Sequence, residues 1–356
     1  MDGGQHIPSR ESVAYVIDPR FPGGTSSAVA RELRAIAAIR ARVAVYAVSS
    51  AMFKGREVAP VLEEALDDLG LTLAWDPPVV AADRVILHNP AFLKFDTRFA
   101  PRIIARDLYV VTHENFLRPT RGEAFDVAAC LALIDRASLA RRKILAPISV
   151  GNRDTVGSWL STAGDTAPWT VLPADWFNIC NFDLQPPNPR RADRRGRHSR
   201  PGYEKFPPLA QMDASFPPHA ETNLILGADS FLTDRSGRPY WRMVPFAGMT
   251  VQRFFDEIDF HVYFTAPTWR ESFGRVLAEA LAAGKVVISD PTTASTFGGG
   301  VIPAVPADVD AVVAHFLHHP KRYLAQVTQG QRILERFSAD RFRVFFEQLS
   351  ELGAIT

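Results

Sequence analysis

Residues 271–290 read ESFGRVLAEALAAGKVVISD, and this stretch decides the fold class. Apolar residues recur in its first part at the spacing of one helix face, which predicts an amphipathic helix over residues 272–283. Gly284 predicts the end of that helix, and the apolar run 285–289 predicts a strand that is buried on both faces. A helix followed directly by a buried strand is typical of parallel α/β sheets.

Two glutamates, Glu271 and Glu279, stand eight positions apart in this stretch. Eight residues of an α-helix rotate by about 80° and rise by about 12 Å, so both carboxylates are predicted on one side of the helix. Backbone N–H groups at the helix start favour an anion such as a phosphate, with Ser272 as a candidate N-cap. The phosphate donors would come from Ser272, Phe273, Gly274 and Arg275. The alternative is an ordinary surface helix that carries two solvated glutamates.

The alternation of helix and strand extends outward from this stretch over most of the chain. In the second half, strands are predicted at residues 194–198, 223–227, 241–245 and 260–264, with helices at 251–257, 308–317, 320–337 and 339–352. In the first half, strands are predicted at 13–18, 42–48, 71–75, 84–88, 108–112, 144–148 and 170–172, with helices at 26–40, 60–69 and 123–141. This order predicts βαβ units and parallel sheets in both halves.

A proline-rich stretch, Gln-Pro-Pro-Asn-Pro, separates the two halves, and we interpret residues 183–190 as a linker. The predicted domains are therefore residues 1–182, which would bind the acceptor, and residues 191–338, which would bind the donor. Residues 339–356 would form a helix that returns to the first domain. Two doubly wound domains that face one central cleft are the predicted architecture, because ligands bind at the carboxyl ends of such strands.

Composition limits the classes of function. The chain has 356 residues, of which 47% are hydrophobic and 22% charged, and this excludes a disordered or coiled-coil protein. The net charge of +1 gives no general attraction to nucleic acid, so none is predicted as a partner. Two cysteines, Cys130 and Cys180, are too few for a disulfide framework or a zinc site, so no metal is predicted. The polar residues 1–10 lack an apolar signal core, which favours a cytoplasmic protein.

Polar residues follow several predicted strands of the first half. Gly23 and Gly24 come after the first strand, where they would let a phosphate or sugar approach the backbone; a tight turn capped by Thr25 or Ser26 is the alternative. His113 follows the strand 108–112 and His88 ends the strand 84–88. Both would project toward a ligand, as a sugar contact or a group that transfers protons.

A third group lies at the end of the first strand of the second half. Arg197, Arg200 and Lys205 fall within nine residues and would form a positive site for a diphosphate. The alternative is a solvated basic linker. A separate basic run at residues 136–143 could face an anionic acceptor or an anionic lipid, which leaves a peripheral membrane contact open.

Together these motifs resemble the retaining glycosyltransferases of the GT-B fold, and specifically glycosyltransferase family 4. Residues 271–290 match that family's E-x7-E element almost from end to end, and Gly23–Gly24 match its glycine loop. His113 resembles its histidine position, and Arg197 and Lys205 resemble its diphosphate-binding pair. One departure is the spacing of this pair. Lys205 stands eight positions after Arg197 but five after Arg200, and five is the usual spacing in the family. Ser272 also stands where the family often has glycine.

The resemblance implies transfer of a sugar from a UDP- or GDP-sugar to an acceptor hydroxyl, with retention of configuration. The acceptor would be a glycan, a glycolipid or a glycoprotein, as in polysaccharide biosynthesis. Glu271, His113, Arg197 and Lys205 would act in catalysis, and Glu279 would bind the ribose. Gly23, Gly24, Arg200 and residues 272–275 would bind the donor, and Thr25 and His88 would lie on the acceptor side. No metal or other cofactor is implied.

Three other functions stay open at this point. A sugar-nucleotide epimerase of the same fold would need no acceptor, and a non-catalytic partner or scaffold protein would need no turnover. A dinucleotide-dependent oxidoreductase would need a complete glycine fingerprint with an acid about 20 residues further on, which Gly23–Gly24 do not supply.

Overall fold

The structure is a computed structural model that describes residues 11–21, 23–39, 41–163, 168–229 and 238–352. Residues 1–10, Pro22 of the glycine loop and Arg40 of a predicted helix lie outside this part. The chain divides into two units. Unit 1 comprises residues 1–117, 123–179 and 339–356, and unit 2 comprises residues 118–122 and 180–338. No helix in the described part of the chain is both long and apolar enough to cross a bilayer.

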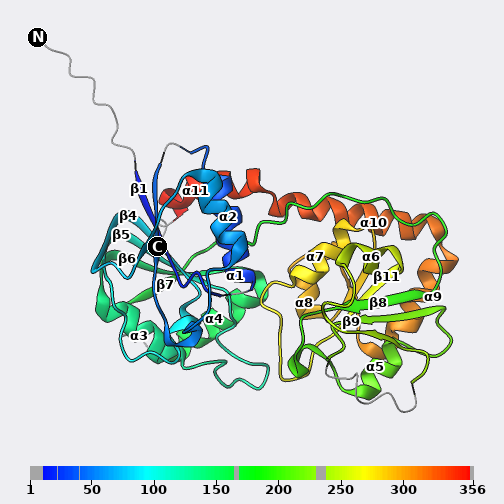
Figure 1. Ribbon diagram of the computed structural model, residues 1–356. Helices are drawn as coiled ribbons and strands as arrows, with labels where there is room; N and C mark the ends of the chain where they lie inside the picture. Colours follow the sequence, from blue (N-terminus) through cyan, green and yellow to red (C-terminus); the bar gives the residue numbers. More distant parts are fainter. Residues whose placement is uncertain (1–10, 22, 40, 164–167, 230–237, 353–356) are drawn as a thin grey trace, which may run out of the picture. The chain divides into compact units, whose positions relative to one another are not determined.

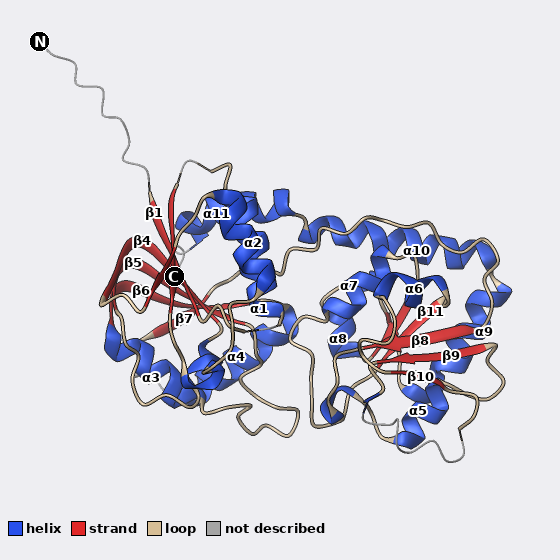
Figure 2. Cartoon of the chain, in the orientation of Figure 1, coloured by secondary structure: helices blue, strands red, loops and turns tan. Residues whose placement is uncertain are grey.

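Unit 1 is built on a seven-stranded parallel sheet with the order β3-β2-β1-β4-β5-β6-β7. Helices cover both of its faces, with α1, α2 and α11 on one and α3 and α4 on the other (Figures 1 and 2). Its strands are β1 (Ser12–Ile17), β2 (Arg42–Ala47), β3 (Leu73–Trp75), β4 (Val79–His88), β5 (Arg102–Thr112), β6 (Ser138–Pro147) and β7 (Trp169–Val171). Its helices are α1 (Gly24–Ile36), α2 (Pro60–Leu69), α3 (Val127–Ala137), α4 (Val150–Ala163) and α11 (Ala339–Leu352).

Unit 2 is built on a six-stranded parallel sheet with the order β10-β9-β8-β11-β12-β13. Helices α6, α7 and α10 lie on one face, and α5 and α9 on the other (Figure 1). Its strands are β8 (Arg194–His198), β9 (Thr222–Leu226), β10 (Arg242–Val244), β11 (Phe260–Tyr263), β12 (Val286–Ser289) and β13 (Ile302–Pro303). Its helices are α5 (Leu209–Ser215), α6 (Val251–Asp256), α7 (Arg275–Ala282), α8 (Pro291–Ser295), α9 (Val309–His318) and α10 (Pro320–Leu334).

The two sheets share one topology. In each, the first strand is central and the chain runs outward on one side before it crosses to the other. The strand order therefore reverses between β1 and β4 in unit 1 and between β8 and β11 in unit 2. Ligands of open α/β sheets bind beside such a reversal, at the carboxyl ends of the strands. The residues that end β4, β8 and β11 are therefore candidates for ligand contacts.

Several expected elements differ from those observed. The predicted helix 123–141 is wrong at its end, because α3 stops at Ala137 and Leu139 already pairs with Ile104 as part of β6. The basic run 136–143 is therefore split between a helix end and a strand, where Arg142 and Lys143 form ion pairs with Asp107 and Asp135. Helices α4, α5 and α8 and strand β13 were not predicted.

The segment 183–190, interpreted as a linker, belongs to unit 2. The backbone N–H of Gln185 donates to the Ala282 carbonyl at the end of α7. Gly284 is required there because its φ of +71° is left-handed and a Cβ would lie 2.6 Å from the Gln185 carbonyl oxygen. The C-terminal helix α11 belongs to unit 1. Its Phe346 carbonyl accepts a hydrogen bond of 2.8 Å from the buried Arg84 guanidinium.

Candidate functional site

Two charged side chains meet at the carboxyl end of β11 in unit 2. The Lys205 ammonium lies 2.6 Å from Glu271 Oε1, and the Tyr263 hydroxyl donates to the same oxygen at 2.6 Å. Burial raises the pKa of the Glu271 carboxyl, but the charge and hydrogen bond of Lys205 outweigh it and leave that pKa below its ordinary value. Glu271 is therefore an ionised group with one oxygen already occupied and the second able to accept a ligand hydroxyl.

The helix after Glu271 begins later than the sequence predicts. Its first residue is Arg275, and the N-cap is Gly274 with a left-handed φ of 84°, not Ser272. Glu271 therefore lies before the helix, and the prediction that Glu271 and Glu279 share one helix side is wrong. Phe273 is a core residue that packs edge-on against Phe297 and Phe337. That packing fixes the turn that leads into α7, whose first N–H groups have no partner inside the helix.

The two candidate diphosphate arginines occupy different environments. The Arg197 side chain is buried, and its guanidinium donates to the carbonyls of Phe264 and Lys205 and lies 4.0 Å from the Phe206 ring centroid. Burial lowers its pKa to about 10, so it stays a cation. The Arg200 side chain is 58% exposed and pairs with Glu204 at 3.0 Å. Arg200 is thus the accessible arginine, whereas Arg197 supports the backbone that carries Lys205.

Glu279 on α7 ends a chain of hydrogen-bonding groups in unit 2. Glu279 Oε2 lies 3.0 Å from His198 Nε2, and His198 Nδ1 lies 3.1 Å from Nε2 of the buried His261. Arg275 pairs with the other oxygen of Glu279 at 3.0 Å. Burial raises the pKa of Glu279, but His198 and Arg275 outweigh it and leave the pKa below its ordinary value. The chain therefore holds an ionised carboxylate at its accessible end.

The glycine loop of unit 1 has one glycine that packing requires and one that it does not. A Cβ on Gly23 would lie 2.6 Å from the Phe21 ring, whereas a Cβ on Gly24 would meet nothing within 4 Å. Gly23 is the N-cap of α1 and no side chain caps this helix, so the cap by Thr25 or Ser26 that belonged to the alternative interpretation is not formed. Thr25 is buried and accepts a hydrogen bond from Asn89 at 3.3 Å.

The two predicted histidines of unit 1 meet at the strand ends. His88 Nδ1 lies 2.9 Å from His113 Nε2. On its other side, His88 Nε2 lies 3.3 Å from Oε2 of Glu32, which is 1% exposed. Burial, with the neighbouring His88, lowers the pKa of His113 well below its ordinary value. His113 is therefore a neutral imidazole at the end of a buried carboxylate–histidine chain.

Sequence reasoning missed several members of these two clusters. Glu32 was detectable, because it stands four residues after Ala28 and four before Ile36 on the apolar face of α1. A glutamate at such a core position requires a partner. His198 and His261 lie in central strands, but nothing in the spacing indicated that they contact each other. Tyr263 has no sequence signal beyond its place at the end of a strand.

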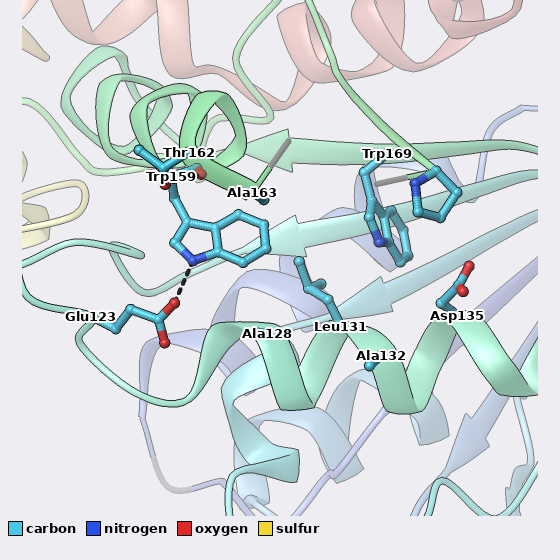
Figure 3. Close-up of a pocket in the computed structure, with 10 residues that line it drawn as sticks. Glu123, Ala128, Leu131, Ala132, Asp135, Trp159, Thr162, Ala163 and Trp169 are labelled. Atoms are coloured by element: carbon cyan, nitrogen blue, oxygen red, sulfur yellow. Dashed lines mark hydrogen bonds between the residues drawn. The ribbon is translucent and has the colours of Figure 1, made fainter. Parts of the chain in front are cut away.

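A cavity of about 390 Å³ lies in unit 1, away from these clusters. Figure 3 shows Trp159 of α4 and Trp169 of β7 above Leu131 of α3, with Glu123 accepting from the Trp159 indole. Both carboxylates that line this cavity already have partners, because Glu123 accepts from Trp159 and Asp135 forms an ion pair with Lys143. A smaller cavity of about 240 Å³ lies beside the unit 2 cluster. Phe264, Thr265, Trp269, Arg270, Asp290 and Thr293 are among its lining residues.

Within the described ranges, no three His, Cys, Asp or Glu side chains gather as a metal ion would require. Cys130 and Cys180 are buried and form no disulfide with each other, as expected of ordinary core thiols.

Comparison with known proteins gives structural neighbours and no sequence family. No family model matches the chain, and no curated protein matches it. The crystal structure of HepE from Anabaena in complex with UDP and glucose matches with a TM-score of 0.64 at 14% identity, over 96% of this chain and 100% of that one. A glycosyltransferase from Rickettsia africae matches with a TM-score of 0.58 at 11% identity, over 98% and 100% of the two chains.

The pneumococcal O-GlcNAc transferase GtfA, in complex with UDP and GlcNAc, matches with a TM-score of 0.50 at 16% identity. That match covers 84% of this chain and 62% of GtfA. At these identities the likeness establishes the fold. The predicted fold class, two Rossmann-like parallel-sheet α/β domains of the GT-B type, is confirmed. Membership of family 4, the roles of the site residues and the central cleft stay predictions.

Proposed function

We propose that the chain is a retaining glycosyltransferase that moves a sugar from a nucleoside diphosphate sugar to an acceptor hydroxyl. The observation that carries this proposal is the cluster of Lys205, Glu271 and Tyr263 at the carboxyl end of β11, directly before the N-terminus of α7. HepE has the same fold and was solved with UDP and glucose, which makes UDP the first donor nucleotide to test.

The charges of unit 2 suit the departure of a nucleoside diphosphate. When the bond from the sugar C1 to the β-phosphate oxygen breaks, negative charge accumulates on the diphosphate. Lys205, Arg200 and the N–H groups that open α7 would stabilise that charge. These cations supply what a divalent metal supplies in other enzymes, so we expect turnover in the presence of EDTA.

The two glutamates would bind hydroxyl groups of the donor. Glu271 would accept from the hydroxyls of the donor sugar through its second oxygen, and Glu279 would accept from the ribose diol. In the retaining step, the acceptor oxygen bonds to C1 on the face that the phosphate leaves. The acceptor proton passes to the departing phosphate oxygen. Glycans, glycolipids and glycoproteins are the acceptor classes. His113 and Thr25 are the candidate contacts in unit 1, with the fully buried His88 behind His113.

A thermal-shift panel with UDP, GDP, ADP, CMP and NAD tests the donor site. A ligand at about 100 times its Kd stabilises the folded state by about 2.7 kcal/mol, which raises the Tm by several degrees. We expect a shift with one nucleoside diphosphate, lost in Glu279→Ala and kept in Glu221→Ala, an exposed glutamate of unit 2. A shift with none of the diphosphates would favour a scaffold protein, and a shift with NAD alone an oxidoreductase.

Donor turnover separates the remaining alternatives. A transferase releases the nucleoside diphosphate only slowly without an acceptor, because water is a poor substitute for it. A sugar-nucleotide epimerase converts the donor with no acceptor at all. Incubating the donor identified by the thermal-shift panel without an acceptor, and analysing both the sugar and the nucleotide, therefore distinguishes these two enzymes.

A further inference from the structure

A buried carboxylate in unit 1 has no place in the function described so far. Glu32 is 1% exposed and is surrounded by three potential donors. The indole N–H of Trp176 donates to Oε1 at 3.1 Å, the Tyr15 hydroxyl donates to Oε2 at 3.4 Å, and His88 Nε2 lies 3.3 Å from Oε2. Burying a carboxylate is costly unless it is paired and hydrogen-bonded, so these three groups offset the cost of Glu32.

These contacts constrain where the protons of the two histidines lie. His88 Nε2 makes no hydrogen bond in the described part of the chain, but it lies 3.3 Å from the carboxylate oxygen. An unprotonated nitrogen would repel that oxygen, so the His88 nitrogen that faces Glu32 carries a proton. In a neutral imidazole the other nitrogen, Nδ1, is then an acceptor. His113 Nε2 lies 2.9 Å from that Nδ1 and must donate to it. The remaining nitrogen of His113, Nδ1, is left with a free lone pair.

We propose that Glu32 and His88 are positioning residues that hold His113 with its proton on Nε2, so that His113 Nδ1 accepts a hydrogen bond from a substrate hydroxyl. The identity of that substrate as a sugar or a sugar acceptor rests on the proposed function. The tautomer itself depends on the contacts of unit 1 and on a neutral His88, and not on the substrate.

The position of His113 suits a hydroxyl better than a phosphate. The ring follows β5 at the carboxyl end of the sheet, is half-buried, and makes no hydrogen bond through Nδ1 within the described part of the chain. A neutral nitrogen acceptor attracts a hydroxyl donor and gives no charge to a phosphate. Burial and the neighbouring His88 lower the pKa of His113, which agrees with a neutral ring.

Glu32→Gln would reverse the direction of the hydrogen bonds along Glu32, His88 and His113 while keeping the shape of the side chain at position 32. Because the Trp176 N–H only donates, the carbonyl oxygen of the new side-chain amide would face Trp176 and its nitrogen would face His88. His88 Nε2 would then accept, His88 Nδ1 would carry the proton, and His113 Nε2 would accept from it. The proton of His113 would move to Nδ1, which would turn the acceptor for the substrate hydroxyl into a donor.

Nitrogen-15 NMR of the full chain, with histidine labelled selectively, tests the proposal without any substrate. Of the nine histidines, His113 is assigned by comparison with His113→Asn. We expect an unprotonated Nδ1 on His113 in the wild type and a protonated Nδ1 in Glu32→Gln. Tyr15→Phe, which removes only one of the three donors to Glu32, is the matched control and should keep the wild-type pattern. Circular dichroism confirms that each variant is folded.

Turnover gives the second measurement. With the donor found by the thermal-shift panel, Glu32→Gln should lower kcat about tenfold, the equivalent of one hydrogen bond, and leave the affinity for the nucleoside diphosphate unchanged. A proton on His113 Nδ1 in the wild type, or an unchanged tautomer in folded Glu32→Gln, would overturn the proposal. Failure of every diphosphate to bind would instead remove the proposed function and leave the tautomer result standing.

Discussion

Each unit holds a carboxylate–histidine–histidine chain at the point where its strand order reverses, and the two chains run in opposite directions. In unit 1 the carboxylate, Glu32, is 1% exposed and the terminal His113 is the accessible member. In unit 2 the terminal His261 is fully buried and the carboxylate, Glu279, is the accessible member, with its side chain 22% exposed. The same three groups thus present an imidazole in one unit and a carboxylate in the other.

Under the proposed function, the difference would give the two units different kinds of recognition. In unit 1 the buried carboxylate would fix the protons of His88 and His113 and leave a neutral nitrogen for a hydroxyl. In unit 2 the buried His261 lies 3.1 Å from His198, which would orient the ionised Glu279 toward a diol. Unit 2 also carries Lys205 and Arg200, whereas the carboxylate of the unit 1 chain accepts from neutral aromatic side chains. Charge stabilisation should therefore belong to unit 2 and hydroxyl positioning to unit 1.

The largest expected effect is that of Lys205→Met, which removes the ammonium beside Glu271. Loss of one group that stabilises developing charge costs about 100- to 1000-fold in kcat, and we expect a loss of that size in donor turnover. Without Lys205, the pKa of Glu271 should also rise, because burial is then opposed by the Tyr263 hydrogen bond and the Arg200 charge without the larger contribution of Lys205. Lys285→Met is the matched control. This lysine is also buried, but it precedes β12 at the amino end of the sheet. Loss of less than half the activity in Lys205→Met would contradict this division of roles.

The second prediction compares the middle histidine of each chain. His198→Asn should weaken binding of the nucleoside diphosphate about tenfold and leave kcat close to the wild-type value, because it loosens Glu279. His88→Asn should do the opposite, with unchanged nucleotide affinity and a kcat about tenfold lower. Isothermal titration and initial-rate kinetics measure the two quantities. Equal effects of both variants on nucleotide affinity would show that the two chains do not have separate roles.

The sequence predicted the sheets well, because their strands have local signals. The strand 194–198 and the helices 60–69 and 339–352 were predicted with the bounds of β8, α2 and α11. Buried parallel strands are apolar runs between turn residues, and a single window of sequence contains that signal. Helix α4 escaped prediction because Gly151, Asn152 and Thr155 occupy buried positions where apolar residues are expected.

Several members of the site were predictable from the sequence, and their contacts were not. His88 was predicted to end a strand, and His113 and Lys205 to follow strands, so their place at the carboxyl ends could be inferred. The burial of Arg197 could not, because it depends on acceptors such as the Phe264 carbonyl, 67 positions away in the chain. The start of α7 at Arg275 depends on the left-handed Gly274, and a window of apolar residues does not detect a backbone dihedral angle.

A smaller effect is expected on the pH dependence of stability. Folding lowers the pKa of both His113 and His261, so the unfolded state binds more protons once the pH falls below about 6.5. The free energy of unfolding should therefore be greatest above that pH and fall by up to about 1.4 kcal/mol per pH unit per histidine below it. The fully buried His261 should account for the larger share of this dependence.

Urea midpoints at pH 7.5 and pH 5.5 measure this dependence for the wild type, His261→Asn and His113→Asn. We expect the difference between the two midpoints to shrink in both variants, and more in His261→Asn. The same difference in His261→Asn as in the wild type would show that this histidine already carries a proton in the folded state.

The smallest expected effect is that of Gly24→Ala, which tests whether a ligand binds in unit 1 beside the Glu32–His88–His113 group. Gly24 is the first residue of α1 and a Cβ there would meet nothing within 4 Å, so Gly24→Ala should stabilise the fold by about 0.4–1 kcal/mol by restricting the unfolded chain. The same methyl group would obstruct a substrate that approaches the helix start, so kcat/KM should fall while the Tm rises. Gly157→Ala, within α4 and also open around its Cβ, is the control that should raise the Tm alone. An unchanged kcat/KM in Gly24→Ala would separate the glycine loop from the site and leave His113 as the contact of unit 1.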